Sequence, residues 1–188
     1  MDDHPLPPWR LLLRAARERE GRSPAARWLQ LATLAPDGTP RVRTLVFRGW
    51  AGSASLDLLS DGRSAKLAEL QHQPAVELCW LLPRARAQFR LRGMAAPPPA
   101  ERLPGELQRH WQQLSPGGRA LWAWPHPGAA LDRAAAFATE LSDTTPPPCF
   151  VLLRFELQQV ELLELGGHPH RRRRWRSDQD WRELELNP

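Results

Sequence analysis

The chain has 188 residues, of which 41% are hydrophobic, and its 26 basic and 21 acidic side chains give a net charge of +5. This length suits one domain with a substantial core and is short for two independent cores. No apolar run approaches the roughly 20 residues that span a bilayer, and the N-terminus is acidic where a signal peptide is basic, so we expect a cytoplasmic protein without a membrane anchor.

The residue pattern of the first half of the chain predicts one helix followed by short strands. Residues 9–20 have apolar side chains at helical spacing and are followed by Gly21, which predicts an N-terminal helix over about 8–21. We expect strands over 28–34, 41–49, 56–60, 75–82 and 86–95, with a helix over 64–71 between the third and the fourth.

The second half reads as a helical insertion followed by more strands. Helical stretches near 100–114, 117–122 and 129–141 define an insertion over about 99–142, and strands are expected over 149–157, 159–165, 170–176 and 181–186. Groups of strands interrupted by helices favour a mainly β (α+β) fold, an antiparallel barrel with helical decoration, as a single domain over 1–188.

Two short segments carry the chemistry. In the strand that begins at Arg43, alternation sends Arg43 to one face and Arg48 to the other. The segment from Ser60 to Lys66 turns into the predicted helix, where hydroxyls and cations gather beside unpaired helical N–H groups. Lys66 is the only lysine of the chain. The two segments together predict a phosphate-binding site of the kind that holds a flavin.

These segments resemble the motifs of the pyridoxamine 5'-phosphate oxidase-like family of FMN-binding split barrels. Two further motifs of the family follow in the same order along the chain: Gln88 in the strand Gln-Phe-Arg-Leu-Arg-Gly, and the pair Arg174-Trp175 near the C-terminus. The resemblance runs from about Ala26 to Pro188, and the tail looks closest to an oxidase-like subfamily without a settled substrate. It implies an antiparallel split β-barrel with FMN as cofactor.

The resemblance also assigns roles to residues. It implies that Arg43 and Lys66 hold the FMN phosphate, that the hydroxyls of Ser60 and Ser64 donate to it, and that Gln88 contacts the isoalloxazine edge. The expected cofactor-binding set is Arg43, Thr44, Leu45, Arg48, Ser60, Arg63, Ser64, Lys66, Gln88 and Arg174. His170 and Arg172 are candidates for the substrate side of the flavin. The resemblance further implies a homodimer with the flavin at the interface.

The chain differs from the vitamin B6 oxidases of that family at positions that contact the substrate. Those enzymes have Arg-x-His-x-Arg where this chain has His170-x-Arg172-x-Arg174, and they hold the substrate phosphate with Tyr, Arg and Ser from the helical segment. This chain has no tyrosine, and Leu114 and Gly118 fall near the Arg and Ser positions. We therefore expect little or no activity on pyridoxamine or pyridoxine 5'-phosphate.

Three function classes follow. The leading one is an FMN-dependent oxidoreductase that moves a hydride from a small-molecule donor to flavin N5. The second is a flavin-binding protein without vitamin B6 oxidase activity. The third is a basic nucleic-acid binder that uses nine tryptophans and the arginines at 171–174.

Strand geometry and composition disfavour the third class. Alternation lets only half of an arginine run in a strand meet one partner. Trp28, Trp80, Trp122 and Trp124 lie in apolar segments, which favours a place in the core or an interface. The two cysteines lack the spacing of metal ligands, so no metal site is expected.

Overall fold

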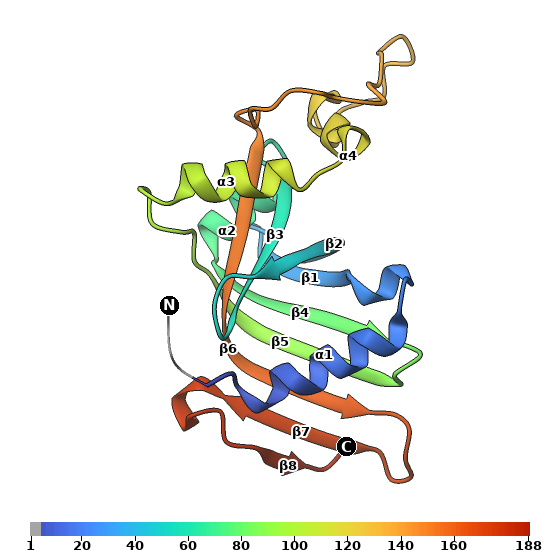
Figure 1. Ribbon diagram of the computed structural model, residues 1–188. Helices are drawn as coiled ribbons and strands as arrows, with labels where there is room; N and C mark the ends of the chain where they lie inside the picture. The colour runs from blue at the N-terminus through green and yellow to red at the C-terminus, as the bar shows by residue number, and fades with distance from the viewer. Residues whose placement is uncertain (1–4) are drawn as a thin grey trace.

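The computed structural model describes residues 5–188, and its centre is a closed antiparallel barrel of six strands (Figure 1). Around the barrel the strands follow the order β3 (Ser55–Asp61), β2 (Pro40–Trp50), β1 (Trp28–Leu34), β4 (Ala75–Leu82), β5 (Ala87–Ala95) and β6 (Phe150–Glu164). The barrel closes because β3 pairs with β6 as well as with β2. Beyond β6, β7 (Arg171–Arg176) and β8 (Leu184–Leu186) extend the sheet. The predicted fold class, a split barrel with helical decoration, is confirmed.

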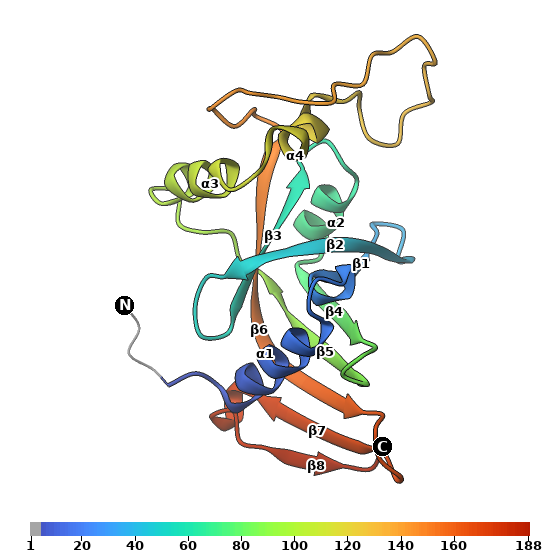
Figure 2. The ribbon, with the colours of Figure 1, turned by 45° about the vertical axis from the view of Figure 1, so that its right-hand side comes forward.

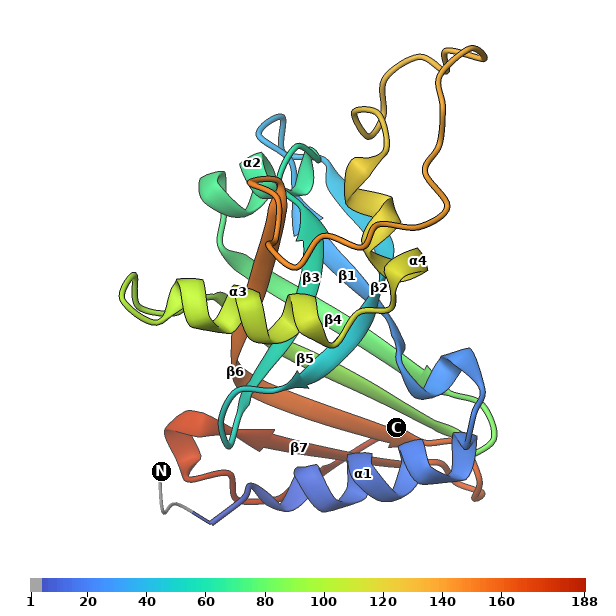
Figure 3. The same cartoon turned by 45° about the horizontal axis from the view of Figure 1, so that its top comes forward.

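The N-terminal helix α1 (Pro8–Glu20) packs against the barrel with the face that carries Trp9 and Leu13, which are 0% and 1% exposed. It ends where the sequence predicts, at Gly21, whose φ of 60° lies in the left-handed region that glycine tolerates. The 3-10 turn η1 (Pro24–Ala26) then leads into β1. In Figure 3, α1 crosses in front of the lower strands of the sheet.

Alternation along the strands fills the barrel interior with leucine and aromatic side chains. Fully buried members of this core include Leu29, Leu31, Leu56, Leu58, Leu78, Trp80, Phe89, Leu91 and Phe155. A second, smaller cluster packs Trp111 and Trp122 against Phe150. This cluster attaches α3 (Leu103–Gln112), α4 (Pro116–Ala120) and the turn η2 (Leu121–Ala123) to the upper end of β3 and β6 (Figure 2).

Strand β6 is a single 15-residue strand where the sequence predicted two. The register against β5 shifts so that Arg92 pairs with Gln159 and Gly93 pairs with Leu157, which leaves one extra residue on β6. Gly93 is required there, because a Cβ atom at this position would lie 2.1 Å from the carbonyl oxygen of Glu156. The predicted break is therefore a bulge inside one strand.

The predicted helix over 129–141 is wrong, and the insertion is helical only up to Ala123. Residues 124–148 form an irregular arm that projects from the upper end of the molecule (Figures 1 and 2). Leu131 and Phe137 in this arm are 71% and 45% exposed. A short helix needs an apolar face buried against the rest of the protein, and in this segment only Leu141 packs against a core cluster.

The last strand is also shorter than predicted. After β7 the chain forms the 3-10 turn η3 (Ser177–Gln179), and Asp180 and Trp181 both have positive φ, 51° and 56°, which interrupts the extended backbone. Trp181 instead packs edge-on against Trp9, with ring centroids 5.7 Å apart. No helix within residues 5–188 is long and apolar enough to cross a membrane.

Candidate functional site

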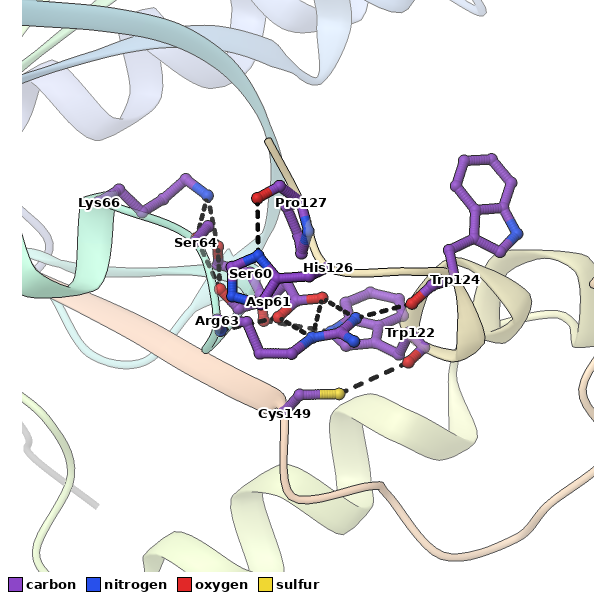
Figure 4. Close-up of polar contacts among 10 residues, drawn as sticks. All are labelled: Ser60, Asp61, Arg63, Ser64, Lys66, Trp122, Trp124, His126, Pro127 and Cys149. Atoms are coloured by element: carbon purple, nitrogen blue, oxygen red, sulfur yellow. Dashed lines mark hydrogen bonds and ion pairs between the residues drawn. The ribbon is translucent and has the colours of Figure 1, made fainter. Parts of the chain in front are cut away.

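Lys66 and two serine hydroxyls meet at the turn between β3 and α2 (Lys66–His72), as Figure 4 shows. The Lys66 ammonium donates to Ser60 Oγ at 2.9 Å and to Ser64 Oγ at 2.6 Å. The turn is held rigidly, because Ser64 Oγ donates to the Asp61 carbonyl at 2.6 Å and the Gly62 N–H donates to the Cys149 carbonyl at 2.7 Å. Two of the expected cofactor hydroxyls and the expected ammonium are thus brought together, and we call Ser60, Ser64 and Lys66 the lysine cluster.

Burial lowers the pKa of Lys66, and the neighbouring Arg43 guanidinium lowers it further. Arg43 is held by a residue that the sequence analysis did not single out. Its guanidinium pairs with Glu69 of α2 at 2.5 Å and donates to the Thr33 hydroxyl. Glu69 is only 5% exposed. Burial raises the Glu69 pKa, but the hydrogen bonds from Thr33 and Arg43 outweigh that effect and leave the pKa lowered.

Arg63 lies beside the lysine cluster but is already engaged. Its guanidinium binds the Asp61 carboxylate, with an NH2 to Oδ2 distance of 2.6 Å, and donates to the Trp124 carbonyl at 3.0 Å (Figure 4). The indole of Trp122 donates to the Ser60 carbonyl at 3.2 Å. Arg63 therefore links the turn to the start of the irregular arm. The sequence alone could not predict this role, because it depends on where the arm lies in the fold.

The other expected residues on β2 flank this site. Thr44 is exposed and Leu45 is partly buried next to Arg43. Arg48 lies at a register shift between Phe47 and Gly49, and its Nε atom is buried without a hydrogen-bond partner among residues 5–188. A buried donor without an acceptor carries an energetic penalty that a ligand acceptor would remove.

The remaining expected residues lie on another part of the sheet. Gln88 on β5 and Arg172 on β7 line a small pocket of about 120 Å³ around Glu161, which binds Arg172 at 2.7 Å and also binds Arg90. Arg174 follows on β7, with a buried Nε atom that has no partner within the described residues. His170 is exposed in the turn before β7, with Nδ1 3.0 Å from the Gly167 carbonyl. Ser60 pairs with Val151 near the start of β6, whereas Gln88 pairs with Leu163 near its end, so one chain does not gather all the expected flavin contacts.

A buried ion-pair network joins α3 to β3 and β6. Asp57 is 0% exposed, and its carboxylate accepts from Arg154 at 2.8 and 2.9 Å and contacts His110 Nε2 at 3.0 Å. Burial raises the Asp57 pKa, but the hydrogen bonds from His110 and Arg154 outweigh it, so the pKa is lowered. Asp57, Glu106 and His110 have ligand atoms within 4.8 Å of one another. Arg109 and Arg154 already neutralise these carboxylates, so the group is an ion-pair network and not a metal site.

Comparison with known proteins identifies the family. A family profile described as "Pyridoxamine 5'-phosphate oxidase, FMN-binding domain" matches residues 6–97. Pyridoxine/pyridoxamine 5'-phosphate oxidase 2 of Arabidopsis thaliana is 31% identical over 165 residues, which cover 84% of this chain and 83% of that protein. The chain belongs to the pyridoxamine 5'-phosphate oxidase-like family. A pyridoxine/pyridoxamine 5'-phosphate oxidase of Salinibacter ruber is 28% identical over 142 residues, covering 76% of this chain and 62% of that protein.

Solved structures agree with this membership. A pyridoxamine 5'-phosphate oxidase-related, FMN-binding protein of Nostoc punctiforme is 36% identical and superposes with a TM-score of 0.90, covering 98% of this chain and all of that one. PhzG of Burkholderia lata has the same fold, with a TM-score of 0.77 and 23% identity, over all of this chain and 95% of that one. FMN, the cofactor predicted from the motifs, is the cofactor of this oxidase-like family.

Proposed function

We propose that this oxidase-like protein is an FMN-dependent oxidoreductase, with the FMN phosphate at the lysine cluster. The observation that carries the proposal is the pair of hydrogen bonds by which Ser60 and Ser64 orient the Lys66 ammonium. No carboxylate of residues 5–188 lies within ion-pair distance of that ammonium, whereas the neighbouring cations Arg43 and Arg63 both have one. Lys66 is therefore the cation of this region that is available to a phosphate.

The residues around the cluster have complementary roles in this proposal. Glu69 orients Arg43 and offsets part of the positive charge of the site. The phosphate would therefore meet a fixed guanidinium group and the ammonium of Lys66, which donates hydrogen bonds. The Arg63–Asp61 pair holds the turn between them. When bound, FMN supplies hydride acceptance at N5, while the protein supplies orientation and charge. The Arg174 guanidinium is suited to stabilise negative charge on a reduced flavin ring.

The proposal includes a homodimer, because Gln88 and Arg174 pair with Leu163 and Glu161 near the end of β6, far along that strand from Val151, the partner of Ser60 in the lysine cluster. A second copy would supply them. The outer face of β1, β2 and β4 exposes apolar side chains that suit such an interface: Trp28 (51%), Val42 (67%) and Leu81 (43%). Val42→Asp should convert the dimer to monomer in light scattering, whereas Leu11→Asp on α1, also exposed, should not. A wild-type monomer with FMN bound would contradict the dimer.

The two free cysteines, Cys79 and Cys149, are compatible with the proposed cytoplasmic location. The catalytic part of the proposal, hydride transfer, separates this function from cofactor storage. FMN-loaded protein incubated anaerobically with a panel of reduced metabolites should lose its yellow absorbance with at least one donor. Retained absorbance with every donor would contradict the oxidoreductase hypothesis and favour a flavin-binding protein without this activity.

The cofactor site is tested by FMN titration of the apo-protein. Lys66→Ala should weaken binding by about 1.5–3 kcal/mol, roughly 10- to 150-fold, because a charge-assisted hydrogen bond is lost. Lys66→Arg should retain most of the affinity, and Arg22→Ala, which removes an exposed remote charge, should change nothing. Wild-type affinity in Lys66→Ala would place the phosphate elsewhere.

A further inference from the structure

The irregular arm starts and ends beside the β3–α2 turn that carries the lysine cluster. At its start, the Arg63 guanidinium donates to the Trp124 carbonyl at 3.0 Å. At its end, the Cys149 carbonyl accepts from the Gly62 N–H at 2.7 Å. The Cys149 thiol also donates to the Trp122 carbonyl at 3.5 Å, so the two ends of the arm are linked to each other (Figure 4). The arm is therefore closed on the turn and not attached to it at a single point.

Trp122 connects the same turn to the helical part of the insertion. Its indole N–H donates to the Ser60 carbonyl at 3.2 Å, and its side chain is 8% exposed. The ring packs edge-on against Trp111 and Phe150, with centroid separations of 5.9 and 4.9 Å. The hydroxyl of Ser60 meanwhile accepts from the Lys66 ammonium at 2.9 Å. One residue thus joins the indole, through its backbone, to the cluster, through its side chain.

The contact between the turn and the end of the arm is tight. A Cβ atom at Gly62 would lie 3.0 Å from Val151 Cγ1 and 3.5 Å from the Cys149 carbonyl oxygen. The Arg63 guanidinium is held by the Asp61 carboxylate, with an Nε to Oδ1 distance of 3.0 Å. Closely packed contacts switch between discrete arrangements and do not deform continuously. A movement of the arm must therefore be accompanied by a movement of the turn.

The middle of the arm is held mainly by its own residues. The Trp124 indole donates to the Ala138 carbonyl at 2.8 Å, and its ring lies edge-on to that of Phe137, with centroids 5.4 Å apart. Both rings remain well exposed, at 39% and 45%. The Trp111 indole anchors the second half of the arm at the Asp143 carbonyl, 2.9 Å away. A segment with few buried apolar contacts opens at a low free-energy cost, so its contacts with the turn weigh strongly in keeping it closed.

We propose that a phosphate bound at the lysine cluster stabilises the closed arm, and that Trp122 is a positioning residue for the Ser60 hydroxyl. This inference rests on the proposed function, because it takes the cluster as the FMN phosphate site. With the arm closed, the turn is fixed in the arrangement that orients the Lys66 ammonium, so phosphate binds this state better than an open one. The coupling is reciprocal: the closed arm raises the affinity for phosphate by the factor by which phosphate favours closure.

Arm opening can be measured by trypsin cleavage after Arg133, which is exposed and is the only arginine or lysine of residues 124–148. Mass spectrometry compares this cleavage with cleavage after Arg22, an exposed reference site in the loop after α1. We expect saturating FMN to slow the cleavage after Arg133 at least about fivefold relative to the reference site. Riboflavin, which has the same ring system without the phosphate, should not slow it. Lys66→Ala should remove the difference between the two flavins.

The reciprocal effect is measured by titrating variants with both flavins. Trp122→Phe keeps an aromatic ring against Phe150 but removes the donor to Ser60, and it should weaken FMN binding at least about fivefold while leaving riboflavin binding unchanged. A merely structural role would weaken both flavins equally. Trp181→Phe makes the same chemical change at the C-terminal turn, where the ring packs on Trp9, and is the matched control. It should bind both flavins as the wild type does.

The outcomes separate this inference from the proposed function. Absence of FMN binding, or wild-type affinity in Lys66→Ala, would mean that the proposed function itself fails. FMN binding with unchanged cleavage after Arg133, or equal protection by riboflavin, would overturn the coupling alone. The cleavage experiment uses the wild-type chain, so it decides the question even if Trp122→Phe does not fold.

Discussion

The arginines of β7 and three arginines that line one pocket, Arg17, Arg27 and Arg48, here called the arginine triad, carry similar charge, but their surroundings differ. On β7 and its turn, Arg171 pairs with Glu185, Arg172 with Glu161, Arg173 with Glu164 and Arg176 with Asp178. The triad has no such partner among residues 5–188. A run of consecutive arginines is thus largely neutralised within the fold, whereas three arginines distant in the sequence converge without neutralisation. The fold, and not the density of charge along the chain, decides which arginines remain without a carboxylate partner.

The ion pairs on β7 also argue against the hypothesis that this arginine run binds nucleic acid. The strand alternation expected from the sequence is present: Arg173 and Trp175 are buried, and Arg172 and Arg174 lie on the opposite face. Carboxylates on β6 and β8 neutralise several of these guanidinium groups. The structure therefore gives this run a role in holding the sheet extension together.

The comparison predicts the largest loss of stability where a substitution neutralises a buried carboxylate that pairs with arginine. Asp57→Asn should lower the free energy of unfolding by about 3–5 kcal/mol, because Arg154 loses its buried counter-charge. Glu185→Gln, at an exposed pair on β8, should cost less than about 1 kcal/mol. Urea unfolding of both variants measures the difference. Equal costs would mean that burial does not separate these pairs.

A smaller effect should alternate along β7. Arg173→Ala should cost about 1–2 kcal/mol of stability, because Arg173 is 7% exposed and binds two carboxylates, while Arg171→Ala should cost little. Arg172→Ala and Arg174→Ala should instead alter FMN affinity or flavin reduction potential. Thermal unfolding and a redox titration separate the two faces. Equal steps at all four positions in nucleic-acid affinity, with unchanged flavin properties, would contradict the alternation.

A pH effect of about tenfold in FMN affinity should distinguish the lysine cluster from the arginine sites. The Lys66 pKa is lowered from 10.5, so in the apo-protein the ammonium loses its proton at a lower pH than an ordinary lysine. Binding of a phosphate dianion favours the charged form, and affinity should fall, by at most tenfold per pH unit, as the pH rises through the lowered value. Fluorescence titration from pH 7 to pH 10 measures this. Lys66→Arg should remove the decline, and a decline that persists in this variant would assign it to another group.

The smallest effect is expected at the arginine triad itself. Arg27→Gln should leave stability unchanged or raise it by about 0.5 kcal/mol at low salt, because it removes repulsion toward Arg17 and Arg48. Added salt should abolish the gain, since screening weakens the repulsion in the wild type. A clear loss of stability in this variant would show that Arg27 has a structural partner.

Local sequence patterns predicted most of the barrel. The alternation over 75–82 predicted β4 with the bounds that the structure has, and the helical spacing up to Gly21 predicted the end of α1. These predictions held because a strand or an amphipathic helix must present one apolar face to the core, and that face is visible in the order of residues. The helix predicted over 129–141 failed because its apolar residues do not form one buried face: Leu131 is exposed, and Phe137 packs only against the exposed Trp124.

The sequence by itself determined the family motifs, the strand alternation and the types of residue proposed to hold FMN. The tertiary structure decided which charges remain available. Glu69 reaches Arg43 across 26 positions, and Arg17, Arg27 and Arg48 come together from three different segments. Such contacts depend on the register of β2 and on where α1 and α2 pack, so no local pattern encodes them. The physical reason is that the interaction of two charges depends on their distance and burial in the fold, and not on their separation along the chain.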